Sequence, residues 1–132
     1  MFEKLDHINL TVRNLDESVQ WYAKIFGFEQ VERGVAMGSP YSIIAKNDFA
    51  LCIYEEEKRK SASSAGDSSH HQIYHFGFRV TDQAQWREIV SRNNLKLHYG
   101  GEIRYPKSIS WYVEDPSGHT IEVTYTEKGL WL

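Results

Sequence analysis

The sequence of 132 residues contains a single cysteine, Cys52, so no disulfide can form within the chain. A lone cysteine in an apolar segment is typical of proteins from a reducing compartment. The sequence also lacks a secretory signal and any apolar run of about 18 residues, the length that spans a bilayer. These absences favour a cytoplasmic protein and argue against a membrane partner.

An excess of positive charge is missing as well. Fifteen Lys and Arg residues stand against eighteen Asp and Glu, which gives a formal net charge of −3. Proteins that bind DNA or RNA neutralise phosphates with a basic patch, so no nucleic-acid partner is expected. The 41% apolar and 25% charged residues are ordinary for a globular protein. A chain of this length is expected to form one domain, 1–132, without a disulfide or structural metal.

The first half of the sequence predicts one strand, one helix and three further strands. Residues 5–12 alternate polar and apolar side chains, as a strand with one buried face does. A helix is expected between Asn14, a good N-cap residue, and Gly27, which permits the left-handed conformation that ends many helices. The further strands are expected at residues 28–32, 41–46 and 49–55. The first module, residues 1–56, therefore has the order βαβββ.

The same order returns after a polar stretch without periodicity, residues 57–71, which is expected to be a flexible linker. The second module, residues 72–132, predicts a strand at 72–81, a helix at 82–94, and strands at 95–99, 108–113 and 120–125. Its opening sequence HFGFRV, from His75, matches HINLTV, from His7. The two modules therefore indicate an internal duplication.

A tight turn is predicted just before the last strand. Pro116 fixes a turn φ, Gly118 permits a positive φ, and the Asp115 carboxylate can bind the turn backbone. The strand that follows carries Glu122 between the apolar residues Ile121 and Val123. A lone glutamate on a strand is most often solvated. Its neighbours in the fold decide whether Glu122 has another role.

The duplication places Cys52 at the first-module counterpart of Glu122. Strand alternation puts both of them, with His7 and His75, on the faces that point away from the helices. These side chains converge if the strands curl around a shared cavity. Two imidazoles and one carboxylate bind a divalent metal and leave positions open for water or substrate. The alternative for each histidine is an ordinary hydrogen-bonded residue of a strand.

Several segments together carry a family resemblance. They are HINLTV at 7–12, LDESVQWY at 15–22, FGF at 26–28 and DPSGHTIE at 115–122. With the repeated βαβββ order, the chain resembles the vicinal oxygen chelate superfamily, which includes glyoxalases, bleomycin-resistance proteins, extradiol dioxygenases and fosfomycin-resistance thiol transferases. The resemblance implies an α+β fold in which two tandem βαβββ modules form a cupped, mixed eight-stranded sheet with helices on the outer face.

The resemblance implies that His7, His75 and Glu122 are the metal ligands, for Fe, Mn, Zn or Ni. Members with four ligands carry a carboxylate or amide where this chain has Cys52. The difference disfavours a four-ligand isomerase and leaves a metal-dependent lyase, dioxygenase or thiol transferase. Tyr112 matches a tyrosine that bonds a metal-bound substrate oxygen in two of these branches. Its alternative role is that of a packed aromatic residue beside Trp111.

Three further residues are expected to contact a small-molecule substrate because they share the faces of the ligands: Asn9, Cys52 and Ser110. The alternative for Cys52 is inert packing, because burial raises a thiol pKa. The arginine that clamps phosphonate in the fosfomycin branch is missing, and the cations nearest in sequence are Arg104, Lys107 and Lys128. His98 is the candidate nearest to the acid–base histidine of an extradiol dioxygenase.

A metal-free alternative also follows from the resemblance. Bleomycin-resistance proteins sequester an aromatic drug or metabolite between two subunits and usually lack the ligand set. A homodimer is expected in either case, because the free edges of an open sheet need cover. The cup is completed by both modules of one chain or by modules of two chains, so His7 comes from the same or a neighbouring subunit. The tail 130–132 is a candidate to cover, or seal, the interface of that dimer.

Overall fold

The computed structural model describes residues 1–62, 69 and 71–127, and the expected C-terminal seal at 130–132 lies outside them. The chain divides into two compact units, Met1–Ser61 and Ala62–Leu132, each of which is described separately below. The division falls inside the stretch expected to link the modules. Within the described residues, no helix has both the length and the apolar character needed to cross a membrane.

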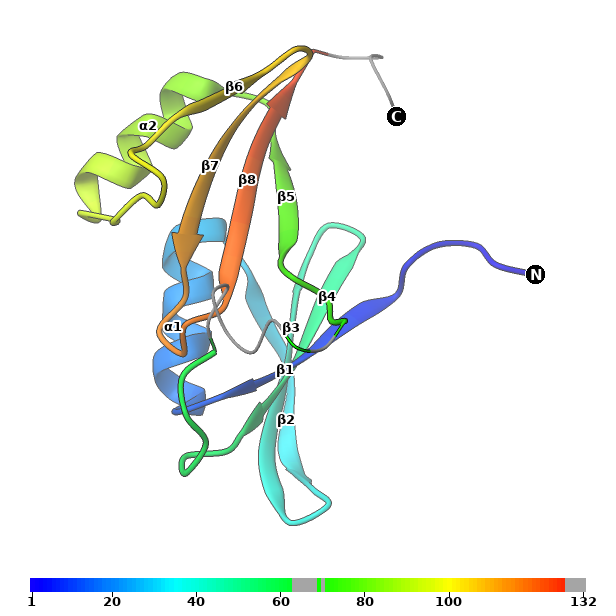
Figure 1. Ribbon diagram of the computed structural model, residues 1–132. Helices are drawn as coiled ribbons and strands as arrows, with labels where there is room; N and C mark the ends of the chain where they lie inside the picture. Colours follow the sequence, from blue (N-terminus) through cyan, green and yellow to red (C-terminus); the bar gives the residue numbers. More distant parts are fainter. Residues whose placement is uncertain (63–68, 70, 128–132) are drawn as a thin grey trace. The chain divides into compact units, whose positions relative to one another are not determined.

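The first unit has a four-stranded sheet in the order β1-β4-β3-β2 (Figure 1). Strand β1 is parallel to β4, whereas the β3–β4 and β2–β3 pairs are antiparallel. The elements in chain order are β1 His7–Val12, α1 Leu15–Phe26, β2 Glu29–Ala36, β3 Ser39–Lys46 and β4 Phe49–Glu55. The strand–helix–three-strand order is the predicted one.

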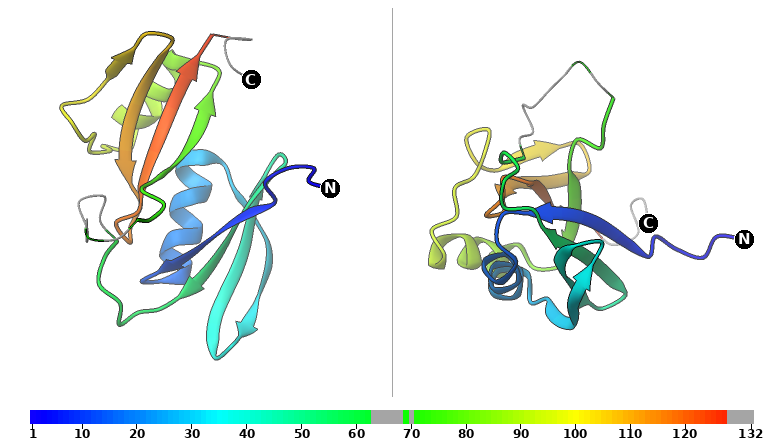
Figure 2. Two further views of the ribbon diagram at one scale, coloured as in Figure 1. Left: turned by 45° about the vertical axis from the view of Figure 1, so that its right-hand side comes forward. Right: turned by 90° about the horizontal axis from the view of Figure 1, so that it is seen from below.

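Helix α1 begins and ends where its capping residues predict. The Asn14 side chain accepts a hydrogen bond from the backbone N–H of Glu17, and Gly27 closes the helix with a φ of 73°. Tyr22 and Ile25 are buried with Leu51 and Ile53 of β4 in the core of this unit. Figure 2 shows α1 alongside the strands of the first sheet. The side chains of alternate strand residues are therefore left on the face opposite the helix.

The second unit repeats this topology with the strand order β5-β8-β7-β6. Its elements are β5 Phe76–Val80, α2 Gln83–Arg92, β6 Ile103–Tyr105, β7 Ser108–Glu114 and β8 Thr120–Thr126. Trp86 of α2 and Trp111 of β7 are buried, and the guanidinium of Arg87 lies 5.7 Å from the Trp111 ring. The expected α+β class with tandem βαβββ modules is confirmed, with the eight strands divided equally between two sheets.

The predicted strand at 95–99 is wrong. This segment is a loop, and the edge strand is the short β6, Ile103–Tyr105. The backbone is left-handed at Asn94 and Tyr99, which no regular strand tolerates. The backbone N–H of His98 also bonds the carbonyl of Tyr112 outside any strand ladder. Other boundaries differ by a few residues, and the largest shifts are in β2, which extends to Ala36, and β5, which begins at Phe76, directly after His75.

The turn before β8 is confirmed. One carboxylate oxygen of Asp115 accepts hydrogen bonds from the backbone N–H groups of Ser117 and His119, each at 2.9 Å. Gly118 has a φ of 89°, which favours glycine. The turn joins β7 to β8 and sets the antiparallel register in which Tyr112 lies opposite Glu122. It therefore positions the carboxylate that the sequence singles out.

Candidate functional site

The strand registers identify equivalent positions in the two units. Asn9 is paired with Cys52 in the first sheet, and Gly77 is paired with Glu122 in the second. His7 and His75 each lie two residues before the first member of these pairs. The register therefore places Cys52 at the counterpart of Glu122, as the internal repeat predicts.

Glu122 of β8 is the centre of a hydrogen-bonded cluster in the second unit. Its Oε2 lies 3.0 Å from Nε2 of His75. Its Oε1 accepts hydrogen bonds from the hydroxyls of Ser110, at 2.6 Å, and Thr124, at 3.1 Å. Burial raises the pKa of Glu122, but the hydrogen bonds from Ser110, His75 and Thr124 outweigh it and hold that pKa below its usual value. The carboxylate is therefore ionised and fixed in orientation.

Gly77 lets strand β5 approach Glu122 closely. A Cβ atom at this position would lie 3.1 Å from the carbonyl oxygen of Glu122 and 3.5 Å from its Cβ. The first unit has the side chain of Asn9 at the equivalent place, opposite a smaller residue, Cys52. The second unit therefore combines a residue without a side chain, Gly77, with the larger Glu122 in the paired position.

Tyr112 of β7 packs against the histidine of this cluster. The two rings are perpendicular, with centroids 5.6 Å apart. The hydroxyl of Tyr112 lies 3.0 Å from the hydroxyl of Tyr105. Burial, the hydrogen bond with Tyr105 and the charge of Glu122 all raise the pKa of Tyr112. Tyr112 is therefore a neutral phenol at physiological pH, able to donate a hydrogen bond but not to act as an ionised base.

The first unit presents His7 and Asn9 on the face of its sheet opposite α1. Nδ1 of the exposed His7 lies 2.7 Å from a carboxylate oxygen of Asp6, which leaves Nε2 available as a ligand. A cavity of about 330 Å³ lies on this side of the unit. Its lining comprises Asn9, Thr11, Ala36, Met37, Ser39, Tyr54 and Glu56.

Cys52 is half-buried on the same face of the first sheet. Burial, followed by the charges of Asp6 and Glu32, raises the pKa of its thiol. The protonated thiol is a poor metal ligand and a weak nucleophile. These properties favour packing or contact with a neutral ligand over coordination of a metal.

The structure thus brings four of the predicted site residues together in the second unit: His75, Ser110, Tyr112 and Glu122. The other three, His7, Asn9 and Cys52, lie on the corresponding face of the first sheet. Sequence reasoning missed two members of the cluster, Thr124 and Tyr105. The alternation of β8 places Thr124 on the same face as Glu122, so the sequence did contain a signal for Thr124. No pattern in the sequence predicted the short strand β6, which carries Tyr105.

A sequence profile of the Glyoxalase/Bleomycin resistance protein/Dioxygenase superfamily matches residues 4–123. The chain belongs to this superfamily. The expected resemblance to the vicinal oxygen chelate proteins is thereby confirmed. Superfamily membership does not select one reaction.

The trivalent organoarsenical cleaving enzyme of Bacillus sp. strain MD1 is 27% identical to this chain, over 94% of this chain and 74% of its own. A glyoxalase/bleomycin resistance/dioxygenase domain from Frankia sp. has a TM-score of 0.80 at 19% identity, over 98% of this chain and 96% of its own. The fosfomycin resistance protein FosX of Listeria monocytogenes, crystallised with Mn(II) and sulfate, has a TM-score of 0.71 at 18% identity, over 97% and 96% of the two chains. The two structures show a shared fold.

The donor groups of the second unit fit a divalent cation. Imidazole nitrogen and carboxylate oxygen are the donors that Mn, Fe, Zn and Ni accept, and the Glu122 carboxylate is already ionised. Among residues 1–62, 69 and 71–127, no group of three or more His, Cys, Asp or Glu side chains is arranged to hold a metal ion. His75 and Glu122 are therefore a pair of potential donors and not a complete ligand set.

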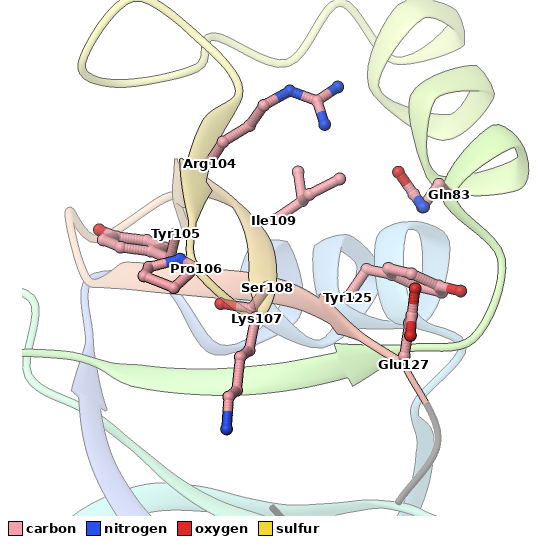
Figure 3. A pocket seen from close by; sticks show the side chains of 9 residues that line it. All are labelled: Gln83, Arg104, Tyr105, Pro106, Lys107, Ser108, Ile109, Tyr125 and Glu127. Carbon is pink, nitrogen blue, oxygen red and sulfur yellow. The ribbon is translucent and has the colours of Figure 1, made fainter. Parts of the chain in front are cut away.

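Two of the cations considered for binding phosphonate, Arg104 and Lys107, lie at the hairpin formed by β6 and β7. Arg104 and Lys107 line a cavity of about 470 Å³ with Ile109 and Tyr125 (Figure 3). Ile109 and Tyr125 are paired in the β7–β8 register and face away from Glu122. Tyr105 also lines this cavity and bonds the hydroxyl of Tyr112, so the cavity adjoins the Glu122 cluster at Tyr105. Lys128, the third cation considered, lies outside the described residues.

His98, the candidate acid–base residue, lies in the loop after α2. Its Nε2 is 3.4 Å from a carboxylate oxygen of Glu114. Its ring contacts Tyr99, which in turn contacts Tyr112. The ring of His98 therefore reaches the cluster around Glu122 through Tyr99, while its backbone N–H bonds the carbonyl of Tyr112 directly.

Proposed function

We propose that this chain is a divalent-metal-dependent enzyme of the superfamily and acts on a small molecule with two adjacent oxygen atoms. The metal ligands in this proposal are His7, His75 and Glu122. The observation that carries it is the ionised Glu122 carboxylate, whose Oε2 lies beside Nε2 of His75 while Oε1 is held by two hydroxyls. A ligand held in this way loses little freedom on binding a cation.

A bound divalent cation supplies Lewis-acid stabilisation of negative charge on the substrate oxygens. The protein residues have separate tasks. Ser110 and Thr124 hold Glu122 so that one oxygen points toward His75. Tyr112, kept neutral, donates a hydrogen bond to a substrate oxygen as negative charge develops there.

His7 is proposed as the third ligand, from the same chain or from a second copy in a homodimer. Its Nδ1 bonds the Asp6 carboxylate, an arrangement that fixes the tautomer with a lone pair on Nε2. Metal-ligating histidines commonly have such a carboxylate partner. We propose Mn(II) as the first ion to test, because FosX, which has the same fold, was crystallised with it.

Bond cleavage is the first reaction class to assay. The relative that cleaves trivalent organoarsenicals is the reason for testing it before isomerisation or thiol transfer. This chain has Cys52 where four-ligand members carry a carboxylate or amide, which agrees with a site of three ligands. Dioxygen uptake with a catechol and with a phenyl arsenical, each in the presence of Mn(II) or Fe(II), separates oxidative from non-oxidative cleavage.

The decisive experiment is elemental analysis of protein purified without added metal and after incubation with Mn(II). We expect close to one equivalent of metal per chain in the wild type and its loss in His75→Ala. His98→Ala removes a histidine of the same unit that bonds Glu114 instead, and should retain the metal. Equal metal content in all three proteins would refute the proposed ligand set.

One observation favours a second function. His75 and Glu122 already bond each other, and the rings of Tyr74 and Tyr112 contact His75. A metal-free protein that sequesters an aromatic drug or metabolite would use the same face. Tight binding of an aromatic ligand that is unaffected by EDTA, together with a lack of bound metal, would favour this second function.

A further inference from the structure

The cavity beside the β6–β7 hairpin has no role in the proposed function. Its volume of about 470 Å³ is in the range of pockets that hold small organic ligands. It is lined by residues of the hairpin, of the C-terminal part of β8 and of the first turn of α2, all from the second unit. The chemistry of these side chains indicates which ligand the cavity accepts.

Three residues that line the cavity form a row across the second sheet. Arg104 of β6 is paired with Ile109 of β7, and Ile109 is paired with Tyr125 of β8. Directly paired residues point to the same face of a sheet, and alternation puts this row on the face opposite Ser110 and Glu122. Neighbouring strands are about 4.8 Å apart, so the backbones of β6 and β8 are about 10 Å apart. The row therefore combines a cation at one end with an apolar surface beside it.

A network of hydrogen bonds holds the guanidinium of Arg104. One carboxylate oxygen of Glu102 accepts from Arg104, at 3.0 Å, and the other accepts from Arg87, at 2.9 Å. Arg87 lies against the Trp111 ring and also donates to the side-chain oxygen of Gln83, at 3.2 Å. Two guanidinium groups share one carboxylate, so the network keeps a net positive charge. An arginine has five N–H donors, and the bond to Glu102 leaves others to bind a ligand.

The polar side chains of the cavity favour an anion near Arg104. Figure 3 shows Arg104 of β6 and Gln83 of α2 on either side of Ile109. Because the oxygen of Gln83 is already bonded, its amide N–H₂ group remains to donate to a ligand. Lys107 adds a second cation at the hairpin turn, whereas Glu127, which repels an anion, follows β8 at the other end of the row. An anion is therefore attracted to the β6 end.

We propose that this cavity binds a small organic carboxylate with a compact apolar body. The guanidinium of Arg104 holds the carboxylate, because its planar fork matches the two oxygens. The apolar body packs over Ile109 and Tyr125, the next two residues of the row. The row lies on the face opposite Glu122, so binding does not require the metal of the proposed function.

The test compares three probes added to the full chain at pH 7: cyclohexanecarboxylate, cyclohexanecarboxamide and acetate. Titrations followed by proton–nitrogen NMR give the dissociation constant of each probe and the backbone amides that it affects. Cyclohexanecarboxylate should bind with a dissociation constant on the order of 1 mM or tighter, with shifts concentrated in residues 103–109 and 125–127. The amide lacks the charge and acetate lacks the apolar body, so each should bind about tenfold more weakly or worse.

Two arginine variants separate a specific contact from general charge attraction. Arg104→Gln should weaken the binding of cyclohexanecarboxylate about tenfold or more. The Arg104 side chain is 70% exposed, so its replacement leaves the core intact. Arg92→Gln is the matched control, because Arg92 is 68% exposed, lies at the end of α2 in the same unit and pairs with Glu88. It changes the net charge equally and should alter the affinity by less than about twofold.

Repetition of the titration in EDTA distinguishes this cavity from the candidate metal site. The affinity for cyclohexanecarboxylate should be the same with and without EDTA. A loss of binding in EDTA would place the probe on a bound metal and overturn the inference. Absence of saturable binding, equal affinity for the carboxylate and the amide, or an equal loss in both arginine variants would also overturn it. The metal content of the wild type and His75→Ala, which tests the proposed function, is independent of these results.

Discussion

Replacement of Ser110 by alanine removes the shortest hydrogen bond to Glu122, at 2.6 Å, from a fully buried hydroxyl. A hydrogen bond to a charged group contributes about 1.5–3 kcal/mol. The same carboxylate oxygen keeps its 3.1 Å bond with Thr124, so part of the charge remains satisfied. We therefore expect Ser110→Ala to lower the free energy of unfolding of the metal-free protein by about 1.5 kcal/mol at pH 7.

This loss should depend on pH. The folded-state pKa of Glu122 lies below its unfolded value, so the carboxylate contributes stability above the unfolded pKa, near 4.3. That contribution is lost as the pH falls through the folded pKa. Ser110→Ala raises the folded pKa, so the stability difference between variant and wild type should shrink between pH 7 and about pH 3.

Urea unfolding at pH 7 and at about pH 3 measures both quantities. Ser42→Ala is the matched control, because Ser42 is equally buried and its hydroxyl bonds uncharged groups: it donates to the backbone carbonyl of Glu32 at 2.9 Å and accepts from the side-chain amide of Gln30 at 2.8 Å. Its stability loss should be about 1 kcal/mol at both pH values. The reasoning is refuted if the Ser110→Ala loss is also independent of pH, or is the smaller of the two at pH 7. In the metal-loaded protein, Ser110→Ala should weaken Mn(II) affinity about 10-fold or more.

Gly77→Ala should lower the free energy of unfolding by about 1 kcal/mol in urea, because the new Cβ meets the backbone oxygen of Glu122 at 3.1 Å. An unchanged or higher free energy of unfolding would show that β5 moves aside without cost. Cys52 should react with iodoacetamide more slowly than free cysteine at pH 8, and its rate should still rise above that pH, because burial raises its thiol pKa. A rate equal to that of free cysteine would contradict this.

The parts of the second unit with a clear local signal could be predicted from sequence. Alternation in β7 and β8, with the Asp115 and Gly118 turn between them, set the face on which Glu122 lies. The same parity extends to His75, one residue before β5, and the hydrogen bond to Glu122 shows the two side chains on one face. Periodicity and turn chemistry are local properties, so a single sequence reveals them.

The remainder depends on interactions that are distant in sequence. Alternation of Leu95 and Leu97 with polar residues predicts a strand, but left-handed residues and a bond to Tyr112 make the segment a loop. The true edge strand has three residues, too few for a periodic signal. The contact between Tyr105 and Tyr112 was therefore not predictable. The roles of the predicted ligands in binding metal stay predictions.

For Ser110, the sequence predicted the position of the side chain but not its role. Strand parity placed it on the face of Glu122, where contact with substrate was expected. Its hydroxyl is fully buried and bonds both Glu122 and Thr124. The geometry favours a supporting role for Ser110, a distinction that sequence cannot make because it depends on which neighbour occupies the hydroxyl.

The pairing of Asn9 with Cys52, and of Gly77 with Glu122, makes the two repeats unequal in charge at equivalent positions. The second unit carries an ionised carboxylate there, whereas the first carries a thiol whose pKa burial raises. At neutral pH a cation is therefore attracted to position 122 and not to position 52. Repeats with one backbone topology thus present unlike electrostatic surfaces.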